Sequence, residues 1–291
     1  MRPLVLLISC ALFFGACSSS TTNTNNEPPV FDFSCDVSAG YASAIQAERY
    51  STSETFVATV IVVHGKNGAP SRSHIQSLAT DLNTSGYDVV APTMPWADLA
   101  WNGTLCEGIA HLNELILEEK NAGKSVILLG HSLAGPIALS YVALSNTTDP
   151  DAVVVLAPGH VPHQSTTLAN AHAVSISKAK DLVSNQNSDV TDFQTYNLGG
   201  LVDITSTPEV YLSYHDTEEF PDIEASLPLV DLPILWLAGS DDSLTVVMDG
   251  TFGLPGKMPV SQNNVYKVID GTHFTLVDNV TTELNTWYSG L

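Results

Sequence analysis

The chain has 291 residues, of which 44% are hydrophobic and 14% are charged. This length and apolar content are enough for one large domain with a full hydrophobic core, so a second domain is not required. The 31 acidic and 10 basic side chains give a formal net charge of −21. Because phosphate groups need positively charged partners, this balance excludes nucleic acid as the expected partner and disfavours polyanionic substrates.

Residues 1–17 have the pattern of a secretory signal peptide. One positive charge, Arg2, precedes an apolar run from Leu4 to Phe14, and small residues then precede Cys17. The apolar run is shorter than the roughly 20 residues that a membrane-spanning helix needs. Small residues directly before a cysteine resemble the bacterial lipobox, in which that cysteine is acylated. We therefore expect a leader with Cys17 as the acylation site; a secreted protein cut near Ala16 is the alternative.

Residues 18–30 follow the leader and are polar and of low complexity. Such a stretch cannot bury apolar surface, so it predicts a flexible linker before a domain that spans residues 31–291. The expected location is the bacterial cell envelope, at the outer membrane or in the periplasm, and otherwise the medium. Cys10 is a weaker acylation candidate than Cys17, because the apolar run before it would be very short.

Two cysteines, Cys35 and Cys106, remain in the exported part of the chain. An oxidising compartment permits them to form a disulfide. Two unrelated buried cysteines are the alternative interpretation.

The chain before residue 125 is expected to alternate between helices and strands. Apolar spacing predicts a helix over 41–50, a strand over 56–63, a helix over 75–84, a strand over 88–91 and a helix over 108–121. Trp96 and Trp101 lie in the loop after the second strand, at the sheet edge where open α/β sheets bind ligands. These tryptophans either wall a substrate pocket or pack in the core, and both interpretations remain open.

Residues 125–135, with the sequence SVILLGHSLAG, predict a buried strand that turns sharply into a helix. Four consecutive apolar residues are typical of a parallel strand covered on both faces. Ser132 stands at the corner, next to the small residues Gly130, Ala134 and Gly135. A strained backbone at such a corner lifts the serine hydroxyl clear of the sheet, and small neighbours let strand and helix approach closely. A plain strand-to-helix turn is the alternative.

The segment GHSLAG resembles the nucleophile elbow of the α/β-hydrolase family, whose pattern is G-x-S-x-G, with Ala134 at the second glycine. The resemblance covers about residues 56–291, apart from the cap. It implies an α/β-hydrolase fold, with a mostly parallel central sheet, helices on both faces and a cap insertion. It also implies that Ser132 is a nucleophile.

The strand over 56–63 runs directly into His64, Gly65 and Lys66. An H-G turn at this place often forms half of the oxyanion hole in the family, which implies that the backbone amides of Lys66 and Leu133 are the donors. We expect the Lys66 side chain to point to solvent and His64 to brace the turn.

A strand over 152–157 ends in the sequence PGHVPH, where no carboxylate follows up to Gln164. His160 and His163 have the spacing of a metal pair, but no third ligand lies nearby, so we expect no metal and place His160 at the mouth of a substrate pocket. Residues 165–229 lack regular alternation apart from a helix expected over 167–184. The resemblance implies that residues of about 160–230 form the cap over the active site.

The acid and the base are expected at the ends of the last two strands. A strand over 234–238 precedes Asp241 and Asp242, and the family position of the acid corresponds to Asp242. Asp241 is the fallback, and a purely structural loop is the other alternative. The acid orients the imidazole and stabilises its charged form.

A strand over 265–269 precedes His273, which resembles the family's general base. Imidazole titrates near neutrality, so it can take the serine proton and return it to the leaving group. His131 competes for this role, but its place inside the elbow points it away from the hydroxyl. Ser132, Asp242 and His273 occur in the serine, acid, histidine order of the fold.

The resemblance implies a serine hydrolase that cleaves a small-molecule or lipid carboxylic ester through an acyl-enzyme, without a metal or organic cofactor. Membrane attachment is expected only through the N-terminal lipid. Two other functions stay open: a surface-tethered binding or scaffold protein without turnover, and an acyltransferase that uses an alcohol in place of water.

Overall fold

The computed structural model describes residues 29–37 and 46–291. The predicted leader with Cys17, and the predicted linker apart from its last two residues, lie outside the described residues. Within the described residues, no helix combines the length and the apolar character that crossing a membrane requires.

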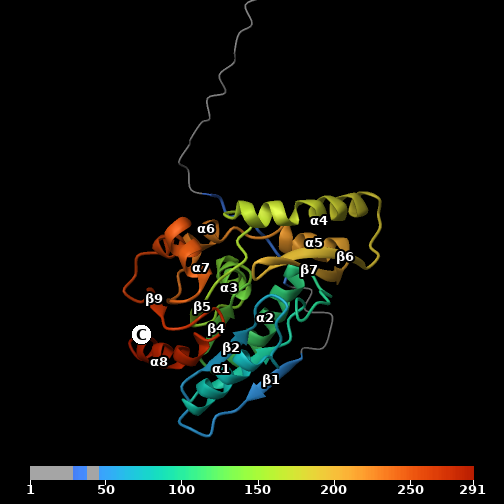
Figure 1. Cartoon of the computed structure of the whole chain (residues 1–291). Helices are drawn as coiled ribbons and strands as arrows, with labels where there is room; N and C mark the ends of the chain where they lie inside the picture. The colour runs from blue at the N-terminus through green and yellow to red at the C-terminus, as the bar shows by residue number, and fades with distance from the viewer. Residues whose placement is uncertain (1–28, 38–45) are drawn as a thin grey trace, which may run out of the picture.

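Seven strands of the described chain form one central sheet (Figure 1). Their order across the sheet is β1 (Ala47–Tyr50), β3 (Asp88–Pro92), β2 (Thr59–Val63), β4 (Val126–His131), β5 (Ala152–Leu156), β8 (Ile234–Gly239) and β9 (Val265–Ile269). Strand β1 is antiparallel to β3, and every other neighbouring pair is parallel. The predicted mostly parallel sheet is therefore confirmed.

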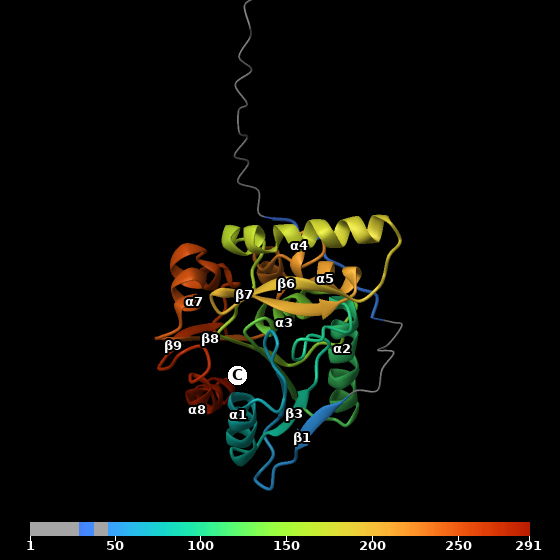
Figure 2. The same ribbon diagram turned by 45° about the vertical axis from the view of Figure 1, so that its right-hand side comes forward.

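Helices cover both faces of the sheet, as predicted. The helices α1 (Ser73–Thr84) and α8 (Val277–Tyr288) pack together over one face, and α2 (Leu105–Asn121) and α3 (Ala134–Ala143) cover the other (Figures 1 and 2). Alternate residues of β2 serve the two cores. Val60 and Val62 join the core with α1 and α8, whereas Ile61 and Val63 join the core with α2 and α3.

The helix predicted over residues 41–50 is wrong in its described part. Residues 46–50 contain strand β1, in which Ala47 lies opposite Pro92 and Tyr50 opposite Val89 of β3. Residues 41–45 lie outside the described residues. Pairing with the open edge of β3 satisfies the backbone of this short segment, and that tertiary contact outweighs its weak helical spacing.

The chain leaves the sheet between β5 and β8 and forms an insertion, residues 157–233. Its elements are α4 (Thr166–Ser184), β6 (Thr191–Asn197), β7 (Gly200–Ser206), α5 (Pro208–His215), α6 (Ile223–Ser226) and a 3₁₀ turn (Leu227–Leu229). Helix α4 packs on α5 and on the hairpin of β6 and β7, while α5 and α6 contact α2 and α3 (Figure 2). The insertion therefore lies on the α2 and α3 side of the sheet.

A second irregular segment joins β8 to β9. It contains α7 (Ser243–Thr245), a π-helical segment (Val246–Thr251) and a 3₁₀ turn (Leu254–Lys257). This segment starts at the carboxyl end of β8, the edge of the sheet at which β4, β5 and β9 also end. It therefore contributes side chains to the same edge as the insertion.

A disulfide joins Cys35 to Cys106, with the two Cα atoms 5.3 Å apart. Cys106 lies in the first turn of α2, and Cys35 is buried in the core that contains α2 and α3. The bond therefore fastens the described N-terminal segment, residues 29–37, to the body of the domain.

Removing this disulfide is expected to lower the free energy of unfolding by about 4 kcal/mol, because the bridge closes a long loop and restricts the unfolded chain. Cys35→Ser with Cys106→Ser is compared with the wild type in guanidinium chloride, with and without reductant. Reductant is expected to shift only the wild-type midpoint. Free thiols in the unreduced, denatured wild type would contradict the prediction.

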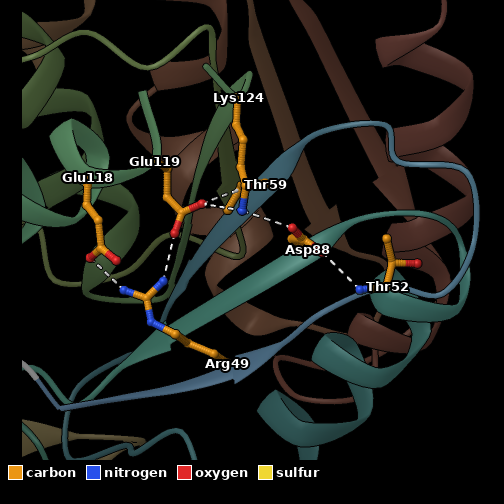
Figure 3. Close-up of polar contacts among 7 residues, drawn as sticks. All are labelled: Arg49, Thr52, Thr59, Asp88, Glu118, Glu119 and Lys124. Atoms are coloured by element: carbon orange, nitrogen blue, oxygen red, sulfur yellow. Dashed lines mark hydrogen bonds and ion pairs between the residues drawn. The ribbon is translucent and has the colours of Figure 1, made fainter. Parts of the chain in front are cut away.

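A network of polar and charged side chains lies at the edge of the sheet where the parallel strands begin (Figure 3). Its members are Arg49, Thr52, Thr59, Asp88, Glu118, Glu119 and Lys124. Glu119 is at its centre and its side chain is only 5% exposed. The Glu119 carboxylate accepts hydrogen bonds from Arg49 at 2.7 Å and from Lys124 at 2.9 Å. Burial alone raises the pKa of Glu119, but the bonds from Lys124 and Arg49 outweigh burial and hold this pKa below its usual value.

Glu119→Gln is expected to lower the free energy of unfolding by about 2 kcal/mol at pH 7, since charge-assisted hydrogen bonds are lost. A lowered pKa in the folded state stabilises the fold above the unfolded pKa, and this contribution disappears as the pH falls through the folded value. The difference between wild type and Glu119→Gln, measured by urea unfolding, should therefore shrink on acidification.

Glu118→Gln is the matched control, because Glu118 also bonds Arg49 at 2.7 Å but its side chain is 58% exposed. An exposed ion pair contributes less than about 1 kcal/mol. Equal losses in the two variants, or a Glu119→Gln difference that does not depend on pH, would refute a special role for Glu119.

Candidate active site

Ser132 occupies the sharp turn between β4 and α3 and has a left-handed backbone, with φ at +57°. Two glycines make room for this turn. A Cβ on Gly130 would lie 2.1 Å from the Ala134 carbonyl oxygen, and a Cβ on Gly65 would lie 2.7 Å from the Ser132 Cβ. Side chains at these two positions would collide with the turn, so the backbone spacing explains why glycine occupies both.

Ser132, His273 and Asp242 form a continuous chain of hydrogen bonds. The His273 Nε2 lies 3.0 Å from the Ser132 Oγ, and the His273 Nδ1 lies 2.8 Å from Asp242 Oδ2. A carboxylate only accepts, so His273 Nδ1 carries the hydrogen and Nε2 presents its lone pair to the serine hydroxyl. The structure thus brings together three residues that follow β4, β9 and β8, respectively.

Asp242, and not the fallback Asp241, contacts the imidazole. Asp242 is 5% exposed, and its second oxygen, Oδ1, accepts the Leu244 amide at 2.9 Å. Asp241 is exposed, although it lines the cavity beside Ser132. The turn after β8 therefore buries one carboxylate of the pair and leaves the other in solvent.

His131 and His64 hold loops and do not reach the serine hydroxyl. The His131 Nε2 donates to the His273 carbonyl at 2.9 Å, and burial lowers the pKa of His131 to about 3. The His64 Nδ1 donates to the Gly65 carbonyl at 2.9 Å, its Nε2 accepts the Met94 amide, and burial lowers the pKa of His64 to about 4. Both imidazoles are therefore neutral supports: His64 braces the turn and His131 does not contact the serine hydroxyl, as expected.

The residues expected to supply oxyanion donors, Lys66 and Leu133, both line the cavity that contains Ser132. Neither amide donates to another backbone group in residues 29–37 and 46–291. The expectation for the Lys66 side chain is wrong. Its ammonium does not point to solvent but contacts His160, Thr195 and Tyr196 of the insertion. The acceptors that attract it come from the tertiary fold and have no local signal in the sequence.

Two cavities meet at Ser132 and His273. The larger has a volume of about 520 Å³. Its wall includes apolar side chains of the insertion and of the segment between β8 and β9, namely Val161, Leu168, Leu198, Leu244, Val247, Met248 and Phe252. The smaller has a volume of about 230 Å³, and its wall includes the polar side chains of Asn67, Arg72 and His74. A substrate bound at Ser132 can therefore extend into two compartments with different side chains.

The structure places the two expected pocket residues differently. His160 lines the larger cavity, as expected. Trp96 does not line either cavity: it is fully buried and donates its indole N–H to the His64 carbonyl at 3.1 Å. Trp101 is also buried, with its indole N–H on Asn67. Trp96 therefore supports the turn after β2 from within the core, and the interpretation of Trp96 as a pocket wall is wrong.

His160 and His163 each bond a backbone carbonyl through Nε2, at Tyr214 and Phe220 respectively. Within the described part of the chain, no three or more His, Cys, Asp or Glu side chains are grouped so that they could hold a metal ion. The contacts of both histidines are thus structural.

Several cavity residues have no signal in the sequence. They are residues 196–199 of the hairpin turn, and Leu244, Val247, Met248 and Phe252 of the segment between β8 and β9. Neither segment carries a sequence motif or a clear hydrophobic periodicity. The positions of both segments depend on tertiary packing against the sheet. Only a chain-order argument, that both segments follow strand ends on the same edge, could have indicated them.

No protein-family model and no curated protein sequence matches this chain. Solved structures do resemble it. A monoacylglycerol lipase from Paleococcus ferrophilus is 16% identical, with a TM-score of 0.61 over 85% of this chain and 99% of the lipase. Est1E from Butyrivibrio proteoclasticus is 16% identical, with a TM-score of 0.59 over 91% of this chain and 100% of Est1E.

The α/β hydrolase GrgF from Penicillium sp. sh18 is 10% identical, with a TM-score of 0.64 over 84% of this chain and 93% of GrgF. At these identities the likeness concerns the fold and not the substrate. The strand order, the parallel pairing and these three structures together show that the chain has the α/β-hydrolase fold.

Proposed function

We propose that the protein is a serine hydrolase that cleaves carboxylic esters. The observation that carries this proposal is the hydrogen-bonded chain from Asp242 through His273 to Ser132, which opens into two cavities. The names of similar structures, a monoacylglycerol lipase and an α/β hydrolase, agree with hydrolysis. An arrangement of nucleophile, base and orienting acid within hydrogen-bond reach is what acyl transfer needs.

The proposed reaction has two steps. His273 Nε2 takes the Ser132 proton while Oγ attacks the ester carbonyl, and the protonated imidazole then gives that proton to the departing alcohol. Water next attacks the acyl-enzyme, and His273 acts as base again. Asp242 holds the imidazole in the required tautomer and stabilises its charged form.

The amides of Lys66 and Leu133 are the proposed oxyanion donors. Both belong to residues that line the cavity at Ser132, and neither amide is bonded to another backbone group of the described chain. Fixed amide donors stabilise the negative charge that develops on the carbonyl oxygen without having to reorganise.

The two cavities indicate the kind of ester. The larger, apolar cavity suits the acyl chain, and the smaller cavity with Asn67, Arg72 and His74 suits a polar alcohol. The insertion acts in this proposal as a cap, because Tyr196, Asn197 and Leu198 of its hairpin line the cavities.

Ser132→Ala is expected to abolish labelling by a fluorophosphonate probe and to lower kcat/KM for p-nitrophenyl esters by about 10⁴-fold or more, because the nucleophile is lost. Esters of graded acyl length are the substrates, so the same assay measures the depth of the apolar cavity. Hydrolysis is compared with ester exchange in added alcohol, and exchange that exceeds hydrolysis would make the protein an acyltransferase.

The two neighbouring carboxylates provide a matched pair of variants, in which Asp241→Asn is the control for Asp242→Asn. Asp242→Asn should lower kcat by about 10⁴-fold, because the imidazole would lose its oriented tautomer. Asp241→Asn should change kcat little, because Asp241 does not touch the imidazole. A folded wild-type protein that is neither labelled nor active would favour the binding or scaffold function.

We also propose that the protein is exported and anchored by a lipid on Cys17. In a bacterial host fed with labelled palmitate, the wild-type chain should incorporate label and Cys17→Ser should not. Cys10→Ser is the control and should keep the label, because its position leaves too short an apolar run before it. Label that persists in Cys17→Ser, or is absent from the wild type, would exclude the anchor.

A further inference from the structure

The Lys66 ammonium lies among three hydrogen-bond partners of the insertion. Its Nζ is 2.9 Å from His160 Nδ1, 3.0 Å from Thr195 Oγ1 and 3.1 Å from the Tyr196 carbonyl oxygen. His160 follows β5, and the other two residues belong to strand β6. Lys66 itself follows β2, so one side chain joins the sheet to two parts of the insertion.

The tautomer of His160 makes it an acceptor toward Lys66. The His160 Nε2 faces the Tyr214 carbonyl, which can only accept, so Nε2 carries the ring hydrogen. Burial, and then the charge of Lys66, hold the pKa of His160 well below its usual value, so the ring is neutral. Nδ1 therefore has only a lone pair to offer to Lys66.

The same reasoning assigns Thr195. The His215 Nδ1 lies 2.8 Å from the Tyr211 carbonyl and must donate to it, which leaves His215 Nε2 as an acceptor. Burial keeps the pKa of His215 well below its usual value. The Thr195 hydroxyl must therefore donate to His215 Nε2, at 2.8 Å, and its oxygen accepts from Lys66.

All three partners of Lys66 are thus acceptors, and only an ammonium has three hydrogens to give them. A neutral amine would leave one acceptor facing a lone pair. No carboxylate in residues 29–37 and 46–291 forms an ion pair with Lys66. Burial lowers the pKa of Lys66 to about 7, while the three acceptors favour the charged form. The cation is therefore held by neutral dipoles alone.

We infer that the Lys66 side chain is a positioning residue for the reaction at Ser132: its cation fastens the hairpin of the insertion to the loop that carries the Lys66 amide. This inference rests on the proposed function. Tyr196 lines the larger cavity with Lys66, and Asn197 and Leu198 line both cavities with it. The hydrogen bonds of one ammonium group therefore position both the hairpin residues that line the cavities and the backbone amide proposed as an oxyanion donor.

The charge has a second effect. Lys66 lines both cavities with Ser132, and no carboxylate neutralises it within the described chain. In its protonated form, Lys66 adds a positive charge to the cavities that Ser132 lines, and such a charge favours the oxyanion more than the neutral ester. The contribution should therefore appear in kcat and not in KM.

Lys66→Met tests this inference, because it removes the ammonium and keeps the backbone amide and most of the side-chain volume. We expect kcat for p-nitrophenyl esters to fall about 100-fold with KM changed less than about threefold. Lys178→Met is the control: Lys178 also donates to a β6 carbonyl, that of Asp192 at 2.8 Å, but it lines neither of the two cavities at Ser132. The control should keep wild-type kcat.

Thr195 provides the second variant pair. Thr195→Val removes one acceptor of the ammonium and should lower kcat, whereas Thr195→Ser keeps the hydroxyl and should restore most of the loss. A role confined to stability would lower the melting temperature of Lys66→Met and Thr195→Val without changing kcat per folded molecule. That result would overturn the inference.

Hydrogen exchange separates this inference from the proposed function. The amides of residues 196–198 should exchange faster in Lys66→Met than in wild type and in Lys178→Met. If the wild type cleaves no ester but this difference appears, the proposed function fails and the fastening stands. Equal exchange in the three proteins would refute the fastening, even if all of them hydrolyse esters.

Discussion

The backbone turn at Ser132 is the constraint on which the site depends. A positive φ at a residue with a side chain costs about 1–2 kcal/mol, so neighbouring structure must hold it. Three backbone hydrogen bonds do so, each 3.0 Å long: the Ser132 amide donates to Leu156, and its carbonyl accepts the amides of Gly135 and Gly159. The end of β5 and the first turn of α3 therefore fix the direction of the hydroxyl.

Buried neutral histidines hold the loops around this turn. His131 supports the backbone of His273, and His64 supports the turn before Lys66. Burial lowers the pKa of both imidazoles, so they are uncharged at neutral pH. Of these three histidines, only His273 is hydrogen-bonded to the Ser132 hydroxyl, whereas His131 and His64 contact backbone groups.

The core of the fold and the serine, acid and histidine positions follow from local patterns in the sequence. Runs such as residues 126–129 and 234–238 must be buried on both faces, which predicts parallel strands. Carboxyl ends of parallel strands meet at one edge, so residues that follow them are brought together without further information. The choice of Asp242 over Asp241 and of His273 over His131 needed the family pattern, because composition does not distinguish these pairs.

The remainder of the site depends on the insertion, whose fold has little local signal. A lysine in a polar turn is normally hydrated, and only the neighbouring acceptors on β6 and after β5 hold Lys66 against the insertion. Trp96 is fully buried and donates its indole N–H to the His64 carbonyl in the turn after β2, a contact that no local pattern indicates. Backbone geometry of the sheet thus determines which atoms can react, whereas contacts between the insertion and the sheet determine the shape and charge of the space around them.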